Sequence, residues 1–180
     1  MKVFFTSDLH FGHANIIKYC NRPFKTTQEM DDLLISKWNT VVTPDDYVYV
    51  VGDFAFNRGK NNYIQLLTRL NGTKILIVGN HDKNLSRSQA LRFGFAAICY
   101  SLEYVIHGIA LRLQHRPRRL NWYERWFGLR DKKLWVIHGH THRQANPVNY
   151  KTQAINVCTD MWAYTPVPED QIFSYINKLR

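Results

Sequence analysis

The sequence predicts an α/β domain in which the sheet is not purely parallel. Short apolar runs alternate along the chain with stretches of helical periodicity. The first half follows a β-α-β-α-β pattern, whereas the second half is richer in hairpins, which join antiparallel strands. A chain of 180 residues has the usual size of one domain, so we expect a single domain over residues 1–180.

Runs rich in β-branched, aromatic and aliphatic residues predict the strands. They cover residues 2–6, 47–51, 74–78, 97–100, 104–114, 134–137 and 154–157. The run at 104–114 contains His107-Gly108, which is a turn signal, so it predicts a hairpin rather than one long strand.

Helical periodicity predicts helices over residues 14–20, 27–40, 60–70, 86–93 and 169–179. Thr26 and Glu29 have the spacing of a capping box at the start of the second helix. The apolar residues of that helix fall on one face: Met30, Leu33, Leu34 and Trp38. Pro166 and Pro168 mark the entry to the last helix.

Composition and charge exclude several classes of protein. Hydrophobic residues make up 45% and charged residues 21%, which excludes a disordered or fibrous chain. No apolar run approaches the ~18 residues of a membrane span, so no membrane partner is expected. An early Asp8 argues against a secretory signal. The three widely spaced cysteines suggest no disulfide framework, and together these features predict a cytoplasmic protein.

The net charge of +10 suggests an anionic partner. Much of the excess lies in residues 116–133, where seven basic residues face two acidic ones. Such a field attracts phosphate-bearing molecules. The alternative is a solvated basic surface without a partner.

Metal-binding and acid–base residue types follow five of the expected strands. In chain order these are Asp8-Leu9-His10, Asp53, Asn80-His81-Asp82, His115, and His138-Gly139-His140-Thr141-His142. Ligands of α/β sheets bind beyond the carboxyl ends of the strands. We therefore expect these side chains to converge on one place, although each element taken alone would more often be structural.

The residue types suit a site for two divalent metal ions. Asp8 and His10 are two positions apart, as are His140 and His142, so in extended backbone each pair projects from one face. A set of carboxylate, amide and imidazole donors without thiolate suits Mn²⁺, Fe²⁺, Co²⁺ or Zn²⁺ rather than a structural zinc. Two such ions would hold a phosphate and acidify a bridging water into a nucleophile.

The order of these blocks resembles the calcineurin-like metallophosphoesterase superfamily. The blocks are D-x-H, G-D, G-N-H-D, a later histidine after a strand, and G-H-x-H, and they run from Asp8 to His142. The stretches DLHFGHANI, RPF and NVCTDMW are similar to small single-domain bacterial and phage members. The resemblance implies a four-layer α/β/β/α sandwich, in which two facing mixed β-sheets are flanked by helices.

The resemblance also implies roles for individual residues. One metal would be held by Asp8, His10 and His142, and the other by Asn80, His115 and His140. Asp53 would bridge the two ions. His81 would act as the general acid, and Asp82 would orient it. The implied cofactors are two divalent ions, with Mn²⁺ first and Fe²⁺, Zn²⁺, Co²⁺ or Ni²⁺ as alternatives.

The substrate is expected to be a phosphoester, and a nucleotide-like phosphodiester is favoured over a monoester. Residues 116–133 interleave arginines with aromatic residues, as a nucleotide or single-stranded nucleic acid would require, although an amphipathic lid is an equal alternative. The alternative activity is that of a nuclease or end-trimming phosphatase on single-stranded nucleic acid. A non-catalytic scaffold is the third hypothesis. The candidate substrate contacts are His13, Arg22, Arg58, Arg116 and Arg118.

Overall fold

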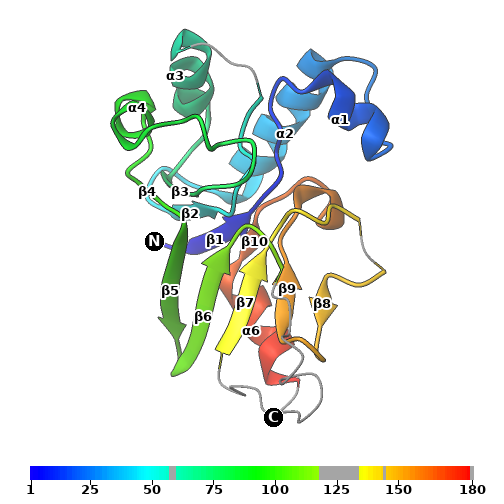
Figure 1. The fold of residues 1–180 in the computed structure, drawn as a ribbon, viewed down its shortest axis with the longest axis vertical. Helices are drawn as coiled ribbons and strands as arrows, with labels where there is room; N and C mark the ends of the chain where they lie inside the picture. Colours follow the sequence, from blue (N-terminus) through cyan, green and yellow to red (C-terminus); the bar gives the residue numbers. More distant parts are fainter. Residues whose placement is uncertain (57–59, 118–133, 144, 179–180) are drawn as a thin grey trace.

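Two five-stranded sheets form the centre of the protein, which the computed structural model describes over residues 1–56, 60–117, 134–143 and 145–178 (Figure 1). The first sheet has the strand order β10-β1-β2-β3-β4. Strands β1 to β4 are parallel, and β10 is antiparallel to β1. The bounds are β1 (Val3–Thr6), β2 (Tyr47–Val50), β3 (Thr73–Ile77), β4 (Ala97–Cys99) and β10 (Val167–Pro168).

The second sheet has the strand order β5-β6-β7-β9-β8. Strands β6, β7 and β9 are parallel, whereas β5 and β8 pair antiparallel with their neighbours. The bounds are β5 (Ser101–Ile106), β6 (Ile109–Gln114), β7 (Leu134–His138), β8 (Val148–Asn149) and β9 (Ala154–Asn156). Both sheets are therefore mixed, as the hairpin-rich second half predicts.

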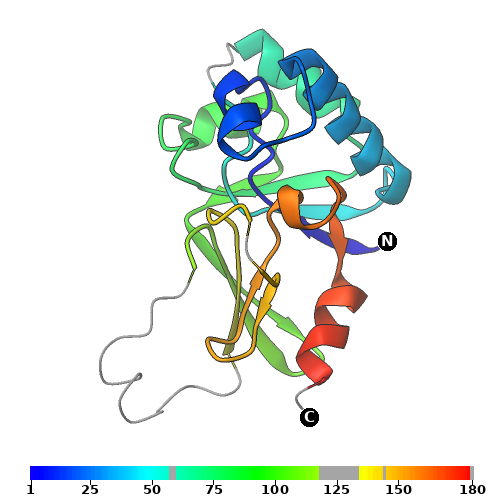
Figure 2. The same ribbon diagram turned by 90° about the vertical axis from the view of Figure 1, so that its right-hand side faces the viewer.

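Helices pack against both sheets. In Figures 1 and 2, α1 to α4 lie beside the first sheet and α6 lies beside the second. Their bounds are α1 (Ala14–Tyr19), α2 (Thr27–Val41), α3 (Lys60–Arg69), α4 (Arg87–Phe93) and α6 (Glu169–Asn177), with a 3₁₀ turn, η1, at Thr159–Met161. No helix within the described ranges is long and apolar enough to cross a membrane.

Two apolar clusters fill the spaces between the layers. Neighbouring residues of β1 show the division: Phe4 packs in the cluster beneath α2, α3 and α4, and Phe5 packs in the cluster shared with the second sheet. Successive side chains of a strand point to opposite faces, so β1 serves both clusters. Ile172 and Ile176 of α6 belong to the second cluster. This arrangement confirms the expected four-layer sandwich.

The carboxyl edges of the two sheets meet at one place. Ser7, directly after β1, forms a parallel bridge with Cys158, which follows β9. The Ser7 backbone N–H donates to the Val157 carbonyl at 3.0 Å. Residues that follow strands in either sheet are thereby brought to the same edge.

The structure refines the expected ends of two helices. At α2, Thr26 accepts from the Glu29 N–H at 3.1 Å, but Glu29 accepts from the Lys25 N–H rather than from Thr26. The capping box is therefore half formed there. A complete capping box lies at α4, between Ser86 and Gln89.

Replacing Trp38 by alanine is expected to lower the free energy of unfolding by about 3–5 kcal/mol, because it opens a cavity in the larger cluster. The indole is fully buried, and its N–H donates to the Asn71 carbonyl at 3.0 Å. Urea unfolding followed by circular dichroism would measure the change. Tyr100→Ala is the control, since Tyr100 is 78% exposed and its loss should cost less than ~0.5 kcal/mol. Equal losses in both variants would contradict the packing described above.

Candidate metal centre

The residues that follow five strands converge at the meeting edge of the two sheets. Among the described residues, four groups of three ligand-type side chains have donor atoms within 4.8 Å of one another, and two of these groups contain only expected metal ligands. The first group is Asp8, His10 and His142; the second is Asp53, His115 and His140. Each group draws side chains from both sheets, so the site exists only where the sheets meet.

Asp53, a member of the second group, also lies close to the first. Its Oδ2 is 3.6 Å from Nε2 of His10, in the first group, and 3.3 Å from Nε2 of His115, in the second. Asn80 joins the second group, because its Oδ1 lies 3.0 Å from the same His115 nitrogen. The structure thus brings together all seven side chains that the sequence proposed as metal ligands.

The backbone at these positions is left-handed. Ten non-glycine residues within the described ranges have positive φ, and five of them are the candidate ligands Asp8, His10, Asp53, His140 and His142, at 56°, 53°, 56°, 70° and 37°. This conformation costs about 1–2 kcal/mol per residue for a side chain other than glycine. Strain of this kind persists only where surrounding contacts enforce it, and it gathers at functional sites.

Buried carboxylates enforce these turns by accepting backbone N–H groups. Asp8 accepts from the His140 N–H at 2.9 Å, which connects the loops after β1 and β7. Asp82 accepts from Asp53 at 2.6 Å, from Gly79 at 2.9 Å and from Phe54 at 3.1 Å.

This geometry corrects the expectation that Asp82 orients His81. The Asp82 carboxylate is turned toward three backbone N–H groups and joins the loops after β2 and β3. Burial raises the pKa of Asp82 to about 6, against the opposing effect of the N–H groups of Gly79, Asp53 and Phe54. Asp82 is therefore a structural support of the site.

Two glycines of the sequence blocks are required by close approach. A Cβ atom on Gly79 would lie 2.2 Å from Oδ1 of Asp53, and one on Gly139 would lie 2.2 Å from Oδ2 of Asp8. Any side chain at either position would displace a candidate ligand. The glycines of G-N-H-D and G-H-x-H therefore set the spacing of the carboxylates.

The donor atoms fit divalent cations. Nε2 of His10 is buried and has no hydrogen-bond partner in the described part of the chain. Burial lowers the pKa of His10 to about 2, so the ring is neutral and offers a lone pair. Burial alone would raise the pKa of Asp53, but the hydrogen bond and charge of His115 outweigh it and hold that pKa at about 2. Ionised carboxylates and the lone pair of a neutral imidazole such as that of His10 are suitable ligands for a divalent metal ion.

His81 lies at the solvent-facing edge of the candidate metal centre. Its backbone N–H donates to Oδ1 of Asp53 at 2.9 Å, and its Nε2 lies 4.0 Å from Oδ2 of the same residue. The ring contacts the edge of Phe56, with centroids 5.5 Å apart. Its side chain is 33% exposed, whereas that of Asp53 is 3% exposed. His81 is thus open to an incoming molecule.

The structure corrects the expectation that Arg22 contacts substrate. Its side chain is fully buried and forms an ion pair with Asp160 at 2.8 Å. His13 is also largely buried: its Nδ1 lies 3.2 Å from Nδ1 of His10, and its ring stacks on Phe56. This placement suits support of His10 rather than contact with substrate.

Of the other expected contacts, only Arg116 falls within the described residues. It is exposed, and burial together with the positive charges of His115 and Arg116 lowers the pKa of His140. The charge of Arg116 therefore acts on the second group. Arg58 and Arg118 lie outside the described residues.

Sequence reasoning missed one carboxylate, Asp160. Its Oδ2 lies 2.9 Å from Nδ1 of His142. Burial lowers the pKa of His142, but the hydrogen bond to Asp160 outweighs burial, and the pKa reaches about 10. The signal was present in the sequence, because Asp160 follows strand β9 as the other site residues follow theirs.

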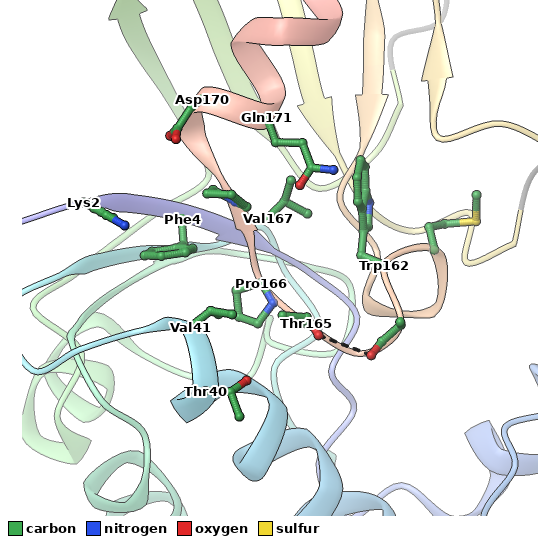
Figure 3. A pocket seen from close by; sticks show the side chains of 13 residues that line it. Lys2, Phe4, Thr40, Val41, Trp162, Thr165, Pro166, Val167, Asp170 and Gln171 are labelled. Atoms are coloured by element: carbon green, nitrogen blue, oxygen red, sulfur yellow. Dashed lines mark hydrogen bonds between the residues drawn. The ribbon is translucent and has the colours of Figure 1, made fainter.

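A separate groove of about 770 Å³ lies away from the candidate metal ligands (Figure 3). Its walls come from β1, the end of α2, the segment after η1, and the start of α6, and they include Phe4, Val41, Trp162 and Asp170. None of the converging ligand-type residues lines it. The groove is therefore not the chemical site.

Comparison with known proteins finds relatives that match nearly the whole chain. An uncharacterised protein of Methanocaldococcus jannaschii is 38% identical over 182 residues, covering 98% of this chain and 92% of that protein. The Gene 66 protein of Mycobacterium phage L5 is 28% identical over 204 residues, covering 97% and 94%. The solved structure of an Aquifex aeolicus protein of unknown function has a TM-score of 0.77 and 28% identity, covering 97% of this chain and 98% of that one.

The family model for calcineurin-like phosphoesterases matches residues 1–164. That span includes every side chain of the two ligand groups. Family membership explains the converging strand ends, the two mixed sheets and the candidate metal groups together. The chain belongs to the calcineurin-like phosphoesterases, a family of metal-dependent hydrolases that act on phosphoesters.

Proposed function

We propose that this protein hydrolyses a phosphodiester in a nucleotide-like substrate at a centre of two divalent metal ions. The observation that carries the proposal is the position of Asp53, whose Oδ2 lies within 3.6 Å of a histidine from each ligand group. A carboxylate in this position suits the bridge of a two-metal site.

The two ligand groups define which side chains would hold each ion. Asp53 bridges, and the remaining ligands divide as Asp8, His10 and His142 for one ion and Asn80, His115 and His140 for the other. When bound, the ions would supply positive charge for the phosphate oxygens and acidify a water for attack on phosphorus. Mn²⁺ is the first choice, because it accepts carboxylate and amide oxygens.

His81 would serve as the general acid. Its Nε2 faces Asp53, yet a third of its side chain is exposed, so a leaving group can reach it. A proton held at Nε2 would pass to the ester oxygen as the bond to phosphorus breaks. Imidazole is suited to this transfer near neutral pH. An alkoxide leaving group, as in a dinucleotide, needs that proton most.

Arg116 supports an anionic substrate, whose phosphate oxygens carry negative charge. It is exposed, and its charge lies near His140. Two divalent ions bound with the carboxylates of Asp8 and Asp53 would leave about two positive charges, to which Arg116 adds a third. Such a field favours anionic phosphodiesters and their flanking phosphates.

With Mn²⁺ loaded, the protein is expected to cleave bis-p-nitrophenyl phosphate faster than p-nitrophenyl phosphate. Asp53→Asn should reduce the rate by more than about 100-fold, which is the upper end of losses from partners beyond the direct ligands. Absorbance of released p-nitrophenolate measures both rates. Asp46→Asn is the matched control, since Asp46 is also a buried carboxylate but lies at the opposite end of β2. Faster monoester cleavage would redirect the assignment to a phosphomonoesterase.

His81→Ala is expected to lower kcat on the dinucleotide TpT by about 10²–10⁴-fold, the usual contribution of a general acid. The loss on bis-p-nitrophenyl phosphate should be smaller, because p-nitrophenolate leaves without a proton. Bound Mn²⁺, measured by elemental analysis, should be unchanged. His107→Ala is the control, since His107 is an exposed imidazole at the β5–β6 turn. Equal losses on both substrates would contradict the assigned role.

The second candidate is a nuclease or end-trimming phosphatase that acts on single-stranded nucleic acid. The net charge of +10 and the exposed Arg116 favour it. Labelled single-stranded DNA and RNA would be incubated with the Mn²⁺-loaded protein at low salt. Cleavage or removal of end phosphate that disappears in Asp53→Asn supports this candidate. Intact oligonucleotides alongside hydrolysed TpT would restrict the substrate to small diesters.

A further inference from the structure

Two sequence stretches without a role in the proposed chemistry meet behind the ligand His142. Arg22 begins the R-P-F stretch after α1, and Asp160 lies in η1. Their side chains are fully buried and form two parallel hydrogen bonds, from Nε to Oδ1 at 2.8 Å and from Nη2 to Oδ2 at 2.9 Å. Such a planar pairing fixes the direction of the carboxylate.

All five N–H groups of Arg22 have partners. Besides the two bonds to Asp160, Nη2 donates to the Asp8 carbonyl at 2.7 Å, and Nη1 donates to the Leu9 carbonyl at 3.0 Å and to the sulfur of Met30 at 3.3 Å. The guanidinium therefore holds the backbone of the first ligand loop and the carboxylate of Asp160 at once.

Asp160 in turn holds His142. Its Oδ2 lies 2.9 Å from Nδ1 of the ring. An ionised carboxylate only accepts hydrogen bonds, so Nδ1 keeps its hydrogen when the ring is in the neutral form that binds a metal ion. The lone pair is then on Nε2, which lies 3.8 Å from Oδ1 of Asp8. The ring thus directs the nitrogen that can bind a metal ion toward Asp8, in the same ligand group.

We propose that Asp160, fixed by Arg22, is a positioning residue that sets the tautomer and orientation of His142 and thereby the affinity of the first metal site. This inference rests on the proposed assignment of Asp8, His10 and His142 to one ion. Arg22 also holds the Asp8 loop, so one buried cation aligns two ligands that are 134 positions apart in the chain (8 and 142).

A third ion in this cluster is the alternative explanation, because ligand atoms of Cys20, His142 and Asp160 also lie within 4.8 Å of one another. The geometry opposes it. The Asp160 carboxylate is already neutralised by Arg22 at 2.8 Å, and the thiol of Cys158 donates to its Oδ2 at 3.3 Å. A metal cation at this place would face a guanidinium, so support of His142 is the function that fits the contacts.

The test is a calorimetric titration of metal-free protein with Mn²⁺. Asp160→Asn keeps the size of the side chain and removes its charge. It is expected to lower the affinity for one of the two Mn²⁺ ions by about 10–100-fold and to change the affinity for the other by less than about threefold. Arg22→Lys, which removes the planar pairing, should lower the affinity for the same ion. The electron paramagnetic resonance signal of the spin-coupled Mn²⁺ pair should fall in both variants when the amount of added Mn²⁺ does not exceed the number of metal sites.

Asp46→Asn is the matched control, because Asp46 is likewise buried and hydrogen-bonded, to Thr43 and the Lys2 N–H, away from the ligands. Thermal unfolding in chelator reports the folding of each variant. Folded variants that keep both affinities, or that lose both ions equally, would overturn the positioning role. Variants that fail to fold while Asp46→Asn folds would assign the pair to stability alone and also overturn it. A wild type that binds fewer than two ions would overturn the proposed centre itself.

Discussion

Acceptance of backbone N–H groups by buried carboxylates is the interaction on which the rest of the site depends. Five candidate ligands, in the loops after β1, β2 and β7, have a left-handed backbone, which an ordinary side chain avoids at a cost of about 1–2 kcal/mol. Asp82 holds the turn after β2 through the N–H groups of Asp53 and Phe54, and Asp8 holds the turn after β7 through His140. Without these acceptors the turns would relax to ordinary conformations, and the side chains would leave the site.

The same constraint requires both sheets. Each ligand group takes residues from the first sheet and from the second, and the two edges are connected through Ser7 and Cys158. The apolar cluster that includes Phe5, Ile77 and Leu113 packs the sheets against each other just below that connection. Packing in this cluster therefore determines the distance between ligands, since a shift of one sheet would separate His142 from Asp8.

The sequence was sufficient for most of the fold and for the candidate ligands, because both depend on local patterns. Strands of four to six residues show apolar runs, and the ligand-type residues follow them directly. Strands β8 and β10 have two residues each, too few for any periodicity, and the structure alone revealed them. The partner of a buried polar side chain was equally hidden. Asp82 adjoins His81 in the chain, yet the turn between them directs its carboxylate to backbone N–H groups.

Exposure separates the polar side chains of the site into two kinds. Arg22, Asp82 and Asp160 are buried with their hydrogen-bonding groups engaged, and moving one would leave a charge without a partner in a medium that solvates it poorly. Such groups are fixed in place and suit the alignment of others. His81 and Arg116 face solvent and can exchange water for a substrate at little cost. In a site where nearly every residue type is chemically able to bind phosphate or transfer a proton, burial decides which ones are free to do so.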